Sequence, residues 1–235
     1  NPVYEHLPPH ATESRRDKIE RLRKSMAERE ADWHFIATLD DIAWLLNLRG
    51  SDVSYNPVFI GFALIGPNSV TLFVAGEKVS KFVRESLERD GVSLLEYTQI
   101  GAALREVPGD ARLLVDPAKI TCGLLDYLDA QVSLVEALNP TTLFKSQKSA
   151  EDARHIRRVM EQDGAALCEF FAWLDGALGR EPVSEPVSEL DIDEQLSLAR
   201  KRRPGYICPS FATIAGFNAN GAMPHYRATE AEFAQ

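Results

Sequence analysis

Two apolar runs joined by a four-residue turn constrain the fold of this chain more than any other feature. The first run, 58–65, is Val-Phe-Ile-Gly-Phe-Ala-Leu-Ile, and the second, 70–74, is Val-Thr-Leu-Phe-Val. The segment 66–69 between them, Gly-Pro-Asn-Ser, consists of residue types that favour a tight turn. Short apolar runs rich in branched and aromatic side chains are typical of buried strands. The sequence therefore predicts a β-hairpin with buried strands.

Helical and strand-like segments alternate on both sides of this hairpin. Apolar residues that recur every three or four positions predict helices, and they do so at 13–31, 39–46, 78–90, 100–107 and 124–131. Further strands are predicted at 33–38, 92–97 and 112–116. This alternation, from about residue 33 to residue 143, predicts an α/β fold with helices packed on a mixed sheet.

The pattern changes after residue 143. A long amphipathic helix is predicted over 145–178, a second helix from Ser188 or Glu189 to about 203, and a strand within 207–214. The tetrapeptide Pro-Val-Ser-Glu occurs twice in succession, at 182–185 and 186–189. A duplication of this length indicates an extended loop, which proteins tolerate well.

These segments predict three regions. Residues 1–11, which hold three prolines and two histidines, are expected to form a linker. Residues 12–143 are expected to form one α/β domain, and residues 144–235 part of a second domain. Two helices and a strand or two are too few to bury a core of their own. The chain begins without methionine and ends without a recognisable closing element, so we expect a piece of a longer protein.

Composition excludes some classes of partner. The net charge of -9 offers no attraction to a phosphate backbone, so nucleic acid is not an expected partner. Short basic clusters at 15–16 and 201–203 are interpreted as solvated helix surface. No apolar stretch approaches the roughly 18 residues that cross a bilayer, so no membrane contact is expected. Three widely spaced cysteines predict buried free thiols in a reducing compartment, the cytoplasm.

Few residues form a pattern that predicts catalysis or ligand binding. Motifs such as HExxH, GxSxG and the P-loop do not occur. The carboxylate pairs Asp40-Asp41 and Asp191 with Asp193 lie at predicted helix starts, where helix-end electrostatics explains them. His225 stands beside Tyr226, after a stretch of small residues, 216–222, that would let a ligand approach the backbone closely. A histidine there could donate to a substrate or shuttle a proton, although the residues alone favour a structural role.

A longer and more specific pattern favours a functional role for His225 over a structural one. Residues 39–53, Leu-Asp-Asp-Ile-Ala-Trp-Leu-Leu-Asn-Leu-Arg-Gly-Ser-Asp-Val, and 55–59, Tyr-Asn-Pro-Val-Phe, closely resemble the large three-domain aminopeptidases P, or X-prolyl aminopeptidases. Prolidases and creatinases share the pattern more loosely. Residues 165–174 resemble the first helix of the family's catalytic domain, and 210–226 resemble the stretch that leads into its active site. The resemblance covers about residues 13–228. It implies a creatinase/prolidase N-terminal-type domain over 12–143, followed by the N-terminal part of the family's catalytic domain over 144–235.

The resemblance implies a function. Such enzymes remove the N-terminal residue of peptides whose second residue is proline. Their catalytic domain has the pita-bread fold and binds two divalent metals, usually manganese, through two Asp, one His and two Glu. A separate histidine contacts the substrate near the scissile bond, and His225 matches that position. The family's metal ligands would lie beyond residue 235, so the isolated chain is expected to be inactive. Members are often homodimers.

Two other interpretations remain open. Some histone-chaperone subunits have a pita-bread domain without metal ligands and use it to bind proteins, so the fold could serve as a binding module. A prolidase or creatinase is the second alternative. Within the family pattern, Arg49, Ser51 and Asp52 are either turn residues with local hydrogen bonds or part of a domain contact.

Overall fold

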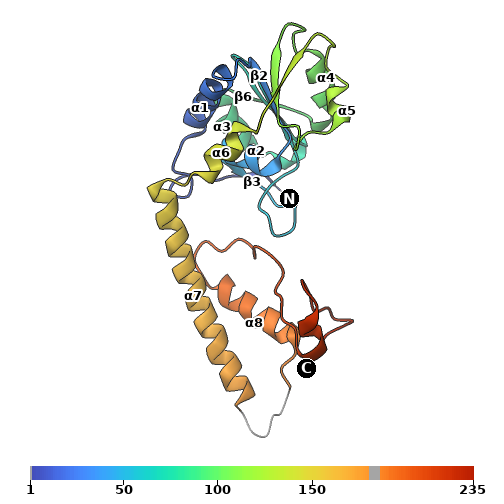
Figure 1. The fold of residues 1–235 in the computed structure, drawn as a ribbon. Coiled ribbons are helices and arrows are strands. Elements are labelled where there is room, and N and C mark those ends of the chain that lie inside the picture. Colours follow the sequence, from blue (N-terminus) through green and yellow to red (C-terminus); the bar gives the residue numbers. More distant parts are fainter. Residues whose placement is uncertain (1, 180–185) are drawn as a thin grey trace. The chain divides into compact units, whose positions relative to one another are not determined.

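The chain folds into two units, Asn1–Asp152 and Ala153–Gln235, shown in Figure 1. The structure is a computed structural model, and it describes residues 2–179 and 186–235. The predicted boundary after residue 143 falls inside a helix, α6 (Pro140–Ser146), which packs against α2 (Leu39–Leu45) of the first unit.

A mixed sheet forms the centre of the first unit, as the sequence predicts, and it has six strands, one more than predicted. The strand order is β6-β5-β4-β2-β7-β8. The strands are β2 (Trp33–Ile36), β4 (Phe62–Ile65), β5 (Val70–Phe73), β6 (Val92–Leu95), β7 (Arg112–Val115) and β8 (Ser133–Glu136). β4 runs antiparallel to both β2 and β5, whereas the pairs β5–β6, β2–β7 and β7–β8 are parallel.

Helices cover both faces of this sheet (Figure 1). The helices and 3-10 turns of the first unit are α1 (Arg15–Ala27), α2, η1 (Gly76–Lys78), α3 (Lys81–Arg89), η2 (Tyr97–Gln99), α4 (Ile100–Arg105), α5 (Cys122–Leu125) and α6. Successive strand residues point to opposite faces. Ile36 therefore lies in the core under α1, α2 and α3, whereas its neighbour Phe35 lies in a second core with residues of α4.

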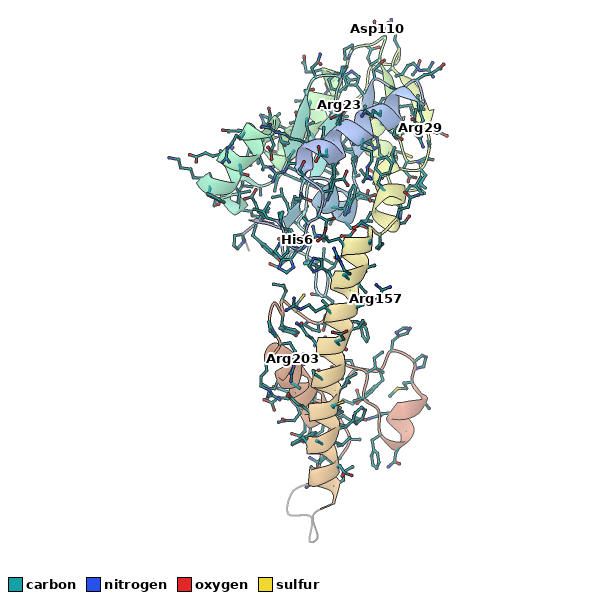
Figure 2. The ribbon with its side chains drawn as sticks, turned by 90° about the vertical axis from the view of Figure 1, so that its left-hand side faces the viewer. His6, Arg23, Arg29, Asp110, Arg157 and Arg203 are labelled. Carbon is teal, nitrogen blue, oxygen red and sulfur yellow. The ribbon has the colours of Figure 1, made fainter. Side chains whose placement is uncertain are left out.

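The predicted hairpin is confirmed, with one difference in length. β4 and β5 pair from Phe62 opposite Phe73 to Ile65 opposite Val70, and Gly66 N–H donates to Ser69 O across the turn. Arg23 of α1, labelled in Figure 2, also donates to Ser69 O at 3.1 Å, and this contact joins the helix to the turn. The strand predicted from residue 58 begins only at Phe62. Val58 and Phe59 lie before strand β4 but are buried in the same core as Ile36.

Other predicted elements differ more from the structure. The helix predicted over 124–131 is the single turn α5, and strand β8 was not predicted. The edge strand β8 shows little apolar alternation, and its Leu134 is 40% exposed. The helix predicted over 145–178 is divided into α6 and α7 (Ala150–Leu178).

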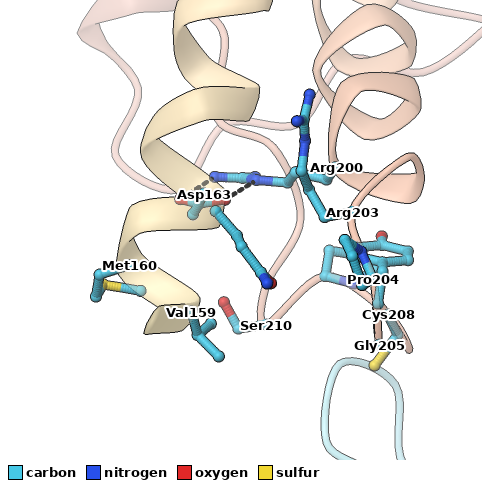
Figure 3. A pocket seen from close by; sticks show the side chains of 12 residues that line it. Val159, Met160, Asp163, Arg200, Arg203, Pro204, Gly205, Cys208 and Ser210 are labelled. Carbon is cyan, nitrogen blue, oxygen red and sulfur yellow. Dashed lines mark hydrogen bonds and ion pairs between the residues drawn. The ribbon is translucent and has the colours of Figure 1, made fainter. Parts of the chain in front are cut away.

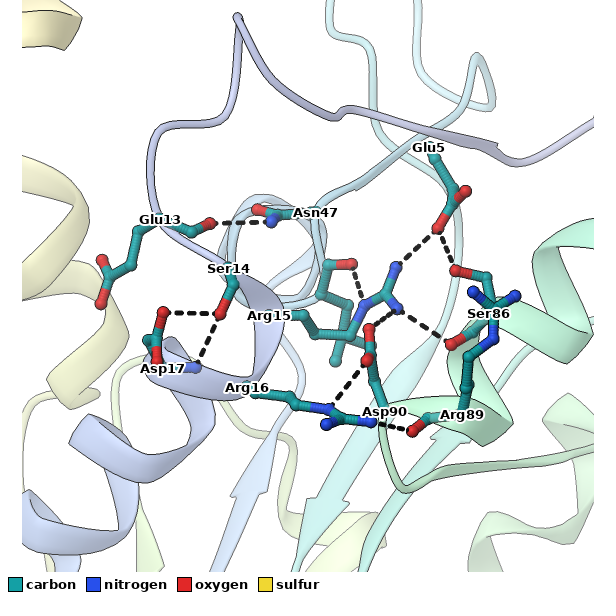
Figure 4. A network of polar contacts seen from close by, with 11 residues as sticks. Glu5, Glu13, Ser14, Arg15, Arg16, Asp17, Asn47, Ser86, Arg89 and Asp90 are labelled. Carbon is teal, nitrogen blue, oxygen red and sulfur yellow. Dashed lines mark hydrogen bonds and ion pairs between the residues drawn. The ribbon is translucent and has the colours of Figure 1, made fainter.

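The first residues of the chain pack against the first unit, although the sequence predicts a linker there. β1 (Tyr4–Glu5) pairs antiparallel with β3 (Leu48–Arg49), and Val3 is 3% exposed. Glu5 also forms an ion pair with Arg15 at the start of α1, at 3.0 Å. Figure 4 shows this contact. This arginine was interpreted as solvated surface, which is wrong: it is 3% exposed.

The segment Arg-Gly-Ser-Asp at 49–52 is held by contacts both near and far in sequence. Arg49 donates to the carbonyl oxygens of Ala43 and Leu48, at 3.1 and 2.8 Å. The Asp52 carboxylate accepts from Ile60 N–H and forms an ion pair with Lys78, both at 2.8 Å. Burial alone would raise the pKa of Asp52, but Lys78 and the Ile60 N–H hold it below its usual value.

Glycine at position 50 is required by close packing, which gives a first prediction. A Cβ atom there would lie 2.7 Å from the Cβ of buried Phe59 and 3.0 Å from the carbonyl oxygen of Val58. We expect Gly50→Ala to lower the free energy of unfolding by about 1–3 kcal/mol through overpacking, measured by urea denaturation. Gly123→Ala is the matched control, because nothing lies within 4 Å of its Cβ. Equal stability of the two variants would contradict the prediction.

The second unit contains two long helices and little other regular structure. α7 is followed by α8 (Glu189–Lys201) and by the 3-10 turn η3 (Asn218–Ala222). The first copy of the Pro-Val-Ser-Glu repeat, 182–185, lies outside the described residues. None of the helices that the structure describes is both long enough and apolar enough to cross a membrane.

Candidate functional site

His225 lies in a tight turn of the second unit. Tyr226 N–H donates to Met223 O at 3.3 Å, which closes a turn with Pro224 in its second position and His225 in its third. His225 has a φ of 58°. Proline second and a positive φ third are the pattern of a type II turn, which normally favours glycine in that third position. The ring is exposed, and no described residue forms a hydrogen bond with it.

The strand predicted just before this turn is absent. Residues 207–217 form neither helix nor strand, and Phe211 is 64% exposed. A strand is stable only when its backbone groups pair with a neighbour. Among the described residues of the second unit, the one β-bridge joins Thr229 and Glu232, so no partner strand is present. The strand predicted within 207–214 therefore does not form.

A buried carboxylate, Glu189, holds the segment on both sides of His225. It is 2% exposed at the first residue of α8. Its Oε1 accepts from Phe217 N–H at 2.6 Å, and its Oε2 accepts from the Tyr226 hydroxyl at 2.7 Å and from Ala234 N–H at 2.8 Å. The amide of Asn220 donates to both oxygens, at 3.2 and 3.1 Å, and also to the Tyr226 hydroxyl at 3.0 Å. One side chain thus gathers three separate parts of the C-terminal segment.

The electrostatics of this cluster favour the ionised carboxylate. Removal from water would raise the pKa of Glu189, but the hydrogen bonds from Phe217, Ala234, Tyr226 and Asn220 outweigh it and lower the pKa to about 2. Burial and the carboxylate beside it raise the pKa of Tyr226 to about 12. The phenol therefore stays a donor and the glutamate an acceptor across the physiological pH range.

The paired carboxylates at helix starts have the structural role that the sequence predicts. Asp40 and Asp41 lie in the first turn of α2, and both form ion pairs with Lys145 of α6. Asp191 accepts from Ser188 N–H at 2.8 Å, while the Ser188 hydroxyl accepts from Asp191 N–H at 3.2 Å. This reciprocal pair is a capping box, which satisfies free N–H groups at the start of α8.

A pocket of about 340 Å³ lies between α7 and the end of α8. Figure 3 shows Asp163 and Arg200 on its wall, joined by two hydrogen bonds of 2.7 and 3.2 Å. Cys208 also lines it, whereas His225 does not. The three cysteines are free, as predicted, but all are exposed, so their predicted burial is wrong. The pocket has no general base beside the thiol, and its carboxylate is already paired, so we assign it no catalytic role.

A second pocket, of about 700 Å³, lies beside α4 in the first unit. Its lining combines three aromatic rings with two cations: Phe62, Tyr97, Tyr127, Arg105 and Lys119. The Arg105 guanidinium lies 4.7 Å from the centre of the Tyr127 ring. No carboxylate, histidine or cysteine lines this pocket. It therefore lacks the groups that most often supply acid–base or nucleophilic catalysis.

A metal site cannot be built from the residues that the structure describes. They contain no group of three or more His, Cys, Asp or Glu side chains that could hold an ion. The carboxylates nearest to His225 in the chain, Glu230 and Glu232, are not gathered with a second histidine. Two divalent metals therefore do not fit the described residues alone.

Family models divide the chain at nearly the same place as the two units. The model described as the creatinase/prolidase N-terminal domain matches residues 1–152, and the model of metallopeptidase family M24 matches residues 154–235. The first match alone covers more than half of the chain. The two lie end to end, in the order that the resemblance to aminopeptidases P led us to expect.

Known proteins with similar sequences carry aminopeptidase names. The chain is 31% identical over 215 residues to "Xaa-Pro aminopeptidase 1" of Dictyostelium discoideum, which covers 91% of this chain and 34% of that protein. It is 37% identical over 227 residues to the "Probable Xaa-Pro aminopeptidase P" of Arthroderma gypseum, which covers 92% of this chain and 35% of that protein. The chain thus spans about a third of the length of these relatives.

A solved structure shows the same fold. The X-prolyl aminopeptidase of Caenorhabditis elegans, described as a cytosolic enzyme with a di-nuclear active site, matches with a TM-score of 0.80. The match covers 90% of this chain and 35% of that one, at 22% sequence identity. The chain belongs to the creatinase/prolidase family: an N-terminal-type domain over its first 152 residues is followed by the start of an M24 metallopeptidase domain.

Proposed function

We propose that the whole protein is a metal-dependent aminopeptidase that releases the N-terminal residue from peptides with proline in second position. The observation that carries this proposal is the order of the two matches, a creatinase-type domain followed directly by an M24 segment. Similarity to Xaa-Pro aminopeptidases over about nine-tenths of the chain supports the substrate class. The prolidase and binding-module alternatives have no comparable support.

Within this function, His225 is proposed as the substrate-side histidine. Its exposed ring has no hydrogen-bond partner among the described residues, so both ring nitrogens are free to meet a ligand. The turn holds the residue at a positive φ, a conformation that persists where surrounding contacts enforce it. Such a ring can donate a hydrogen bond to a peptide carbonyl oxygen or pass a proton to the leaving amine.

The cofactors are proposed as two divalent metals, with manganese as the ion. The M24 match and the di-nuclear site of the Caenorhabditis elegans enzyme support two metals. The described residues offer no such cluster by themselves, so at least some of the ligands would come from outside them. A cytoplasmic location is proposed because the three cysteines are free and because that same enzyme is described as cytosolic. The homodimer expected from the resemblance stays a prediction.

Activity assays on two proteins test the proposal. The full-length protein should hydrolyse a short Xaa-Pro peptide, lose activity with a chelator and regain it with Mn²⁺, and leave the matching Xaa-Ala peptide nearly intact. The isolated 235-residue chain should bind no metal pair and release no product, because its described residues provide no metal site. Metal-dependent turnover by the isolated chain would contradict the second expectation. An inactive, metal-free full-length protein would favour the binding-module alternative.

A further inference from the structure

The contacts of the Glu189 carboxylate indicate a role beyond the start of helix α8. Its hydrogen bonds reach Phe217 and Asn220, which precede His225, and Tyr226, which follows it directly. These residues lie 28–37 positions away in the sequence. We infer that Glu189 is a positioning residue: its carboxylate fixes the 217–226 segment and so sets the direction in which the His225 ring points. This inference rests on the proposed function.

The geometry explains why one side chain can do this. The His225 turn would relax if either flank could move, because a positive φ is unfavourable at a residue other than glycine. The carboxylate holds the two flanks at one point, through Phe217 N–H on one side and the Tyr226 hydroxyl on the other. Asn220 connects these two contacts by donating to the carboxylate and to the phenol. The turn is therefore held at both flanks.

A carboxylate is the one common side chain of this size that satisfies the cluster. Oε1 faces the N–H of Phe217 and Oε2 faces the N–H of Ala234, and a backbone N–H can only donate. Glutamine has the same shape, but either orientation of its amide would place an NH₂ group against one of these donors. Glu189→Gln should therefore break the contact with one of the two backbone donors, Phe217 N–H or Ala234 N–H, and loosen the segment while leaving the volume of the side chain nearly unchanged.

A double-mutant cycle in the full-length enzyme tests the inference. Glu189→Gln should lower kcat for an Xaa-Pro peptide on the order of 10- to 100-fold with little change in KM, because the reacting groups are misplaced while the substrate still binds. In a His225→Ala background the same substitution should lower kcat no further, because the group that it positions is gone. Tyr226→Phe, which removes one donor, should show a smaller loss with the same dependence on His225.

A neighbouring variant separates positioning from general loss of stability. Asp191→Asn weakens the capping box at the start of α8 without touching residues 217–226, so it should lower the melting temperature but leave kcat close to that of the wild type. If Glu189→Gln lowers kcat equally with and without His225, the positioning role is wrong and the proposed function stands. If the wild type is inactive, or if His225→Ala has no effect on kcat, the proposed role of this histidine is wrong. The positioning role of Glu189 is then wrong as well, because it depends on that histidine.

Discussion

Arg15→Ala is expected to lower the free energy of unfolding of the first unit by about 3–5 kcal/mol. The Arg15 guanidinium is buried and bonds four residues from different parts of the chain, among them Ser86, whose carbonyl oxygen accepts at 3.4 Å; Figure 4 shows this network. It lies 3.0 Å from the Glu5 carboxylate, 2.6 Å from that of Asp90, and donates to Leu46 O at 2.7 Å. Alanine would leave the Glu5 side chain, 6% exposed, with a buried charge and no cation beside it. The cost of that uncompensated charge dominates the expected effect.

The next residue provides the control. Arg16 also pairs with Asp90, at 2.9 Å, but its side chain is 64% exposed. Exposed ion pairs contribute only about 0–1 kcal/mol, so Arg16→Ala should remain close to the wild type in chemical denaturation monitored by circular dichroism. Double replacement of Arg15 and Glu5 by apolar residues should recover much of the loss, since it removes both charges. Comparable losses of unfolding free energy for Arg15→Ala and Arg16→Ala would contradict the prediction, because burial of the Arg15–Glu5 ion pair would then not determine the cost.

The stability of the first unit is expected to fall by about 3 kcal/mol between pH 6.5 and pH 4 because of His34. His34 is fully buried on β2, and its Nδ1 lies 2.9 Å from Leu114 O. A carbonyl oxygen only accepts, so Nδ1 carries the proton and Nε2, which has no partner among the described residues, is bare. Protonation would place a charged donor in the core. Burial therefore lowers the pKa of His34 from 6.5 to about 4, despite the opposing hydrogen bond to Leu114.

The direction of the change in stability with pH follows from whether the folded or the unfolded chain binds the proton. Between pH 6.5 and pH 4 the unfolded chain protonates this histidine and the folded chain does not, so stability decreases as the pH falls through that window. His6 acts in the same direction, because partial burial and the nearby Arg49 lower its pKa to about 4. Unfolding free energies measured from pH 7 to pH 4 for the wild type, His34→Leu and His6→Gln would separate the two. The His34→Leu curve should be flatter than that of the wild type, and an identical slope would refute the assignment.

Much of the first unit could be predicted because its signals are local. The turn Gly-Pro-Asn-Ser at 66–69 and the apolar runs beside it predict a hairpin without knowledge of any other segment. Strand β8, which was not predicted, and the strand predicted within 207–214, which does not form, show the limit of that approach. Whether a short apolar segment becomes a strand depends on a partner elsewhere in the chain, and a local pattern does not contain that information.

The candidate site shows the same limit. His225 could be noted because small residues precede it and because the segment resembles a known family. Glu189 could be read only as a helix-start residue, since the donors that it gathers lie 28–45 positions later in the chain. Arg15 was misread for the same reason: nothing beside it in the sequence reveals that Glu5 and Asp90 close over it. A charged side chain can be buried only where hydrogen-bond or ion-pair partners surround it, and the fold decides which residues those are.

The central place of β2 in the sheet has a consequence for synthesis on the ribosome. β2 pairs with β4 on one side and with β7 on the other, and the β7 contact joins His34 to Leu114, 80 residues later. Strands β2, β4, β5 and β6 can therefore assemble while β7 is still being made. Until it arrives, β2 presents a free apolar edge, which is the kind of surface that recruits other chains. The late pairing of β7 with β2 is expected to be the slow step of folding, and the chain is expected to be most prone to aggregation before it occurs.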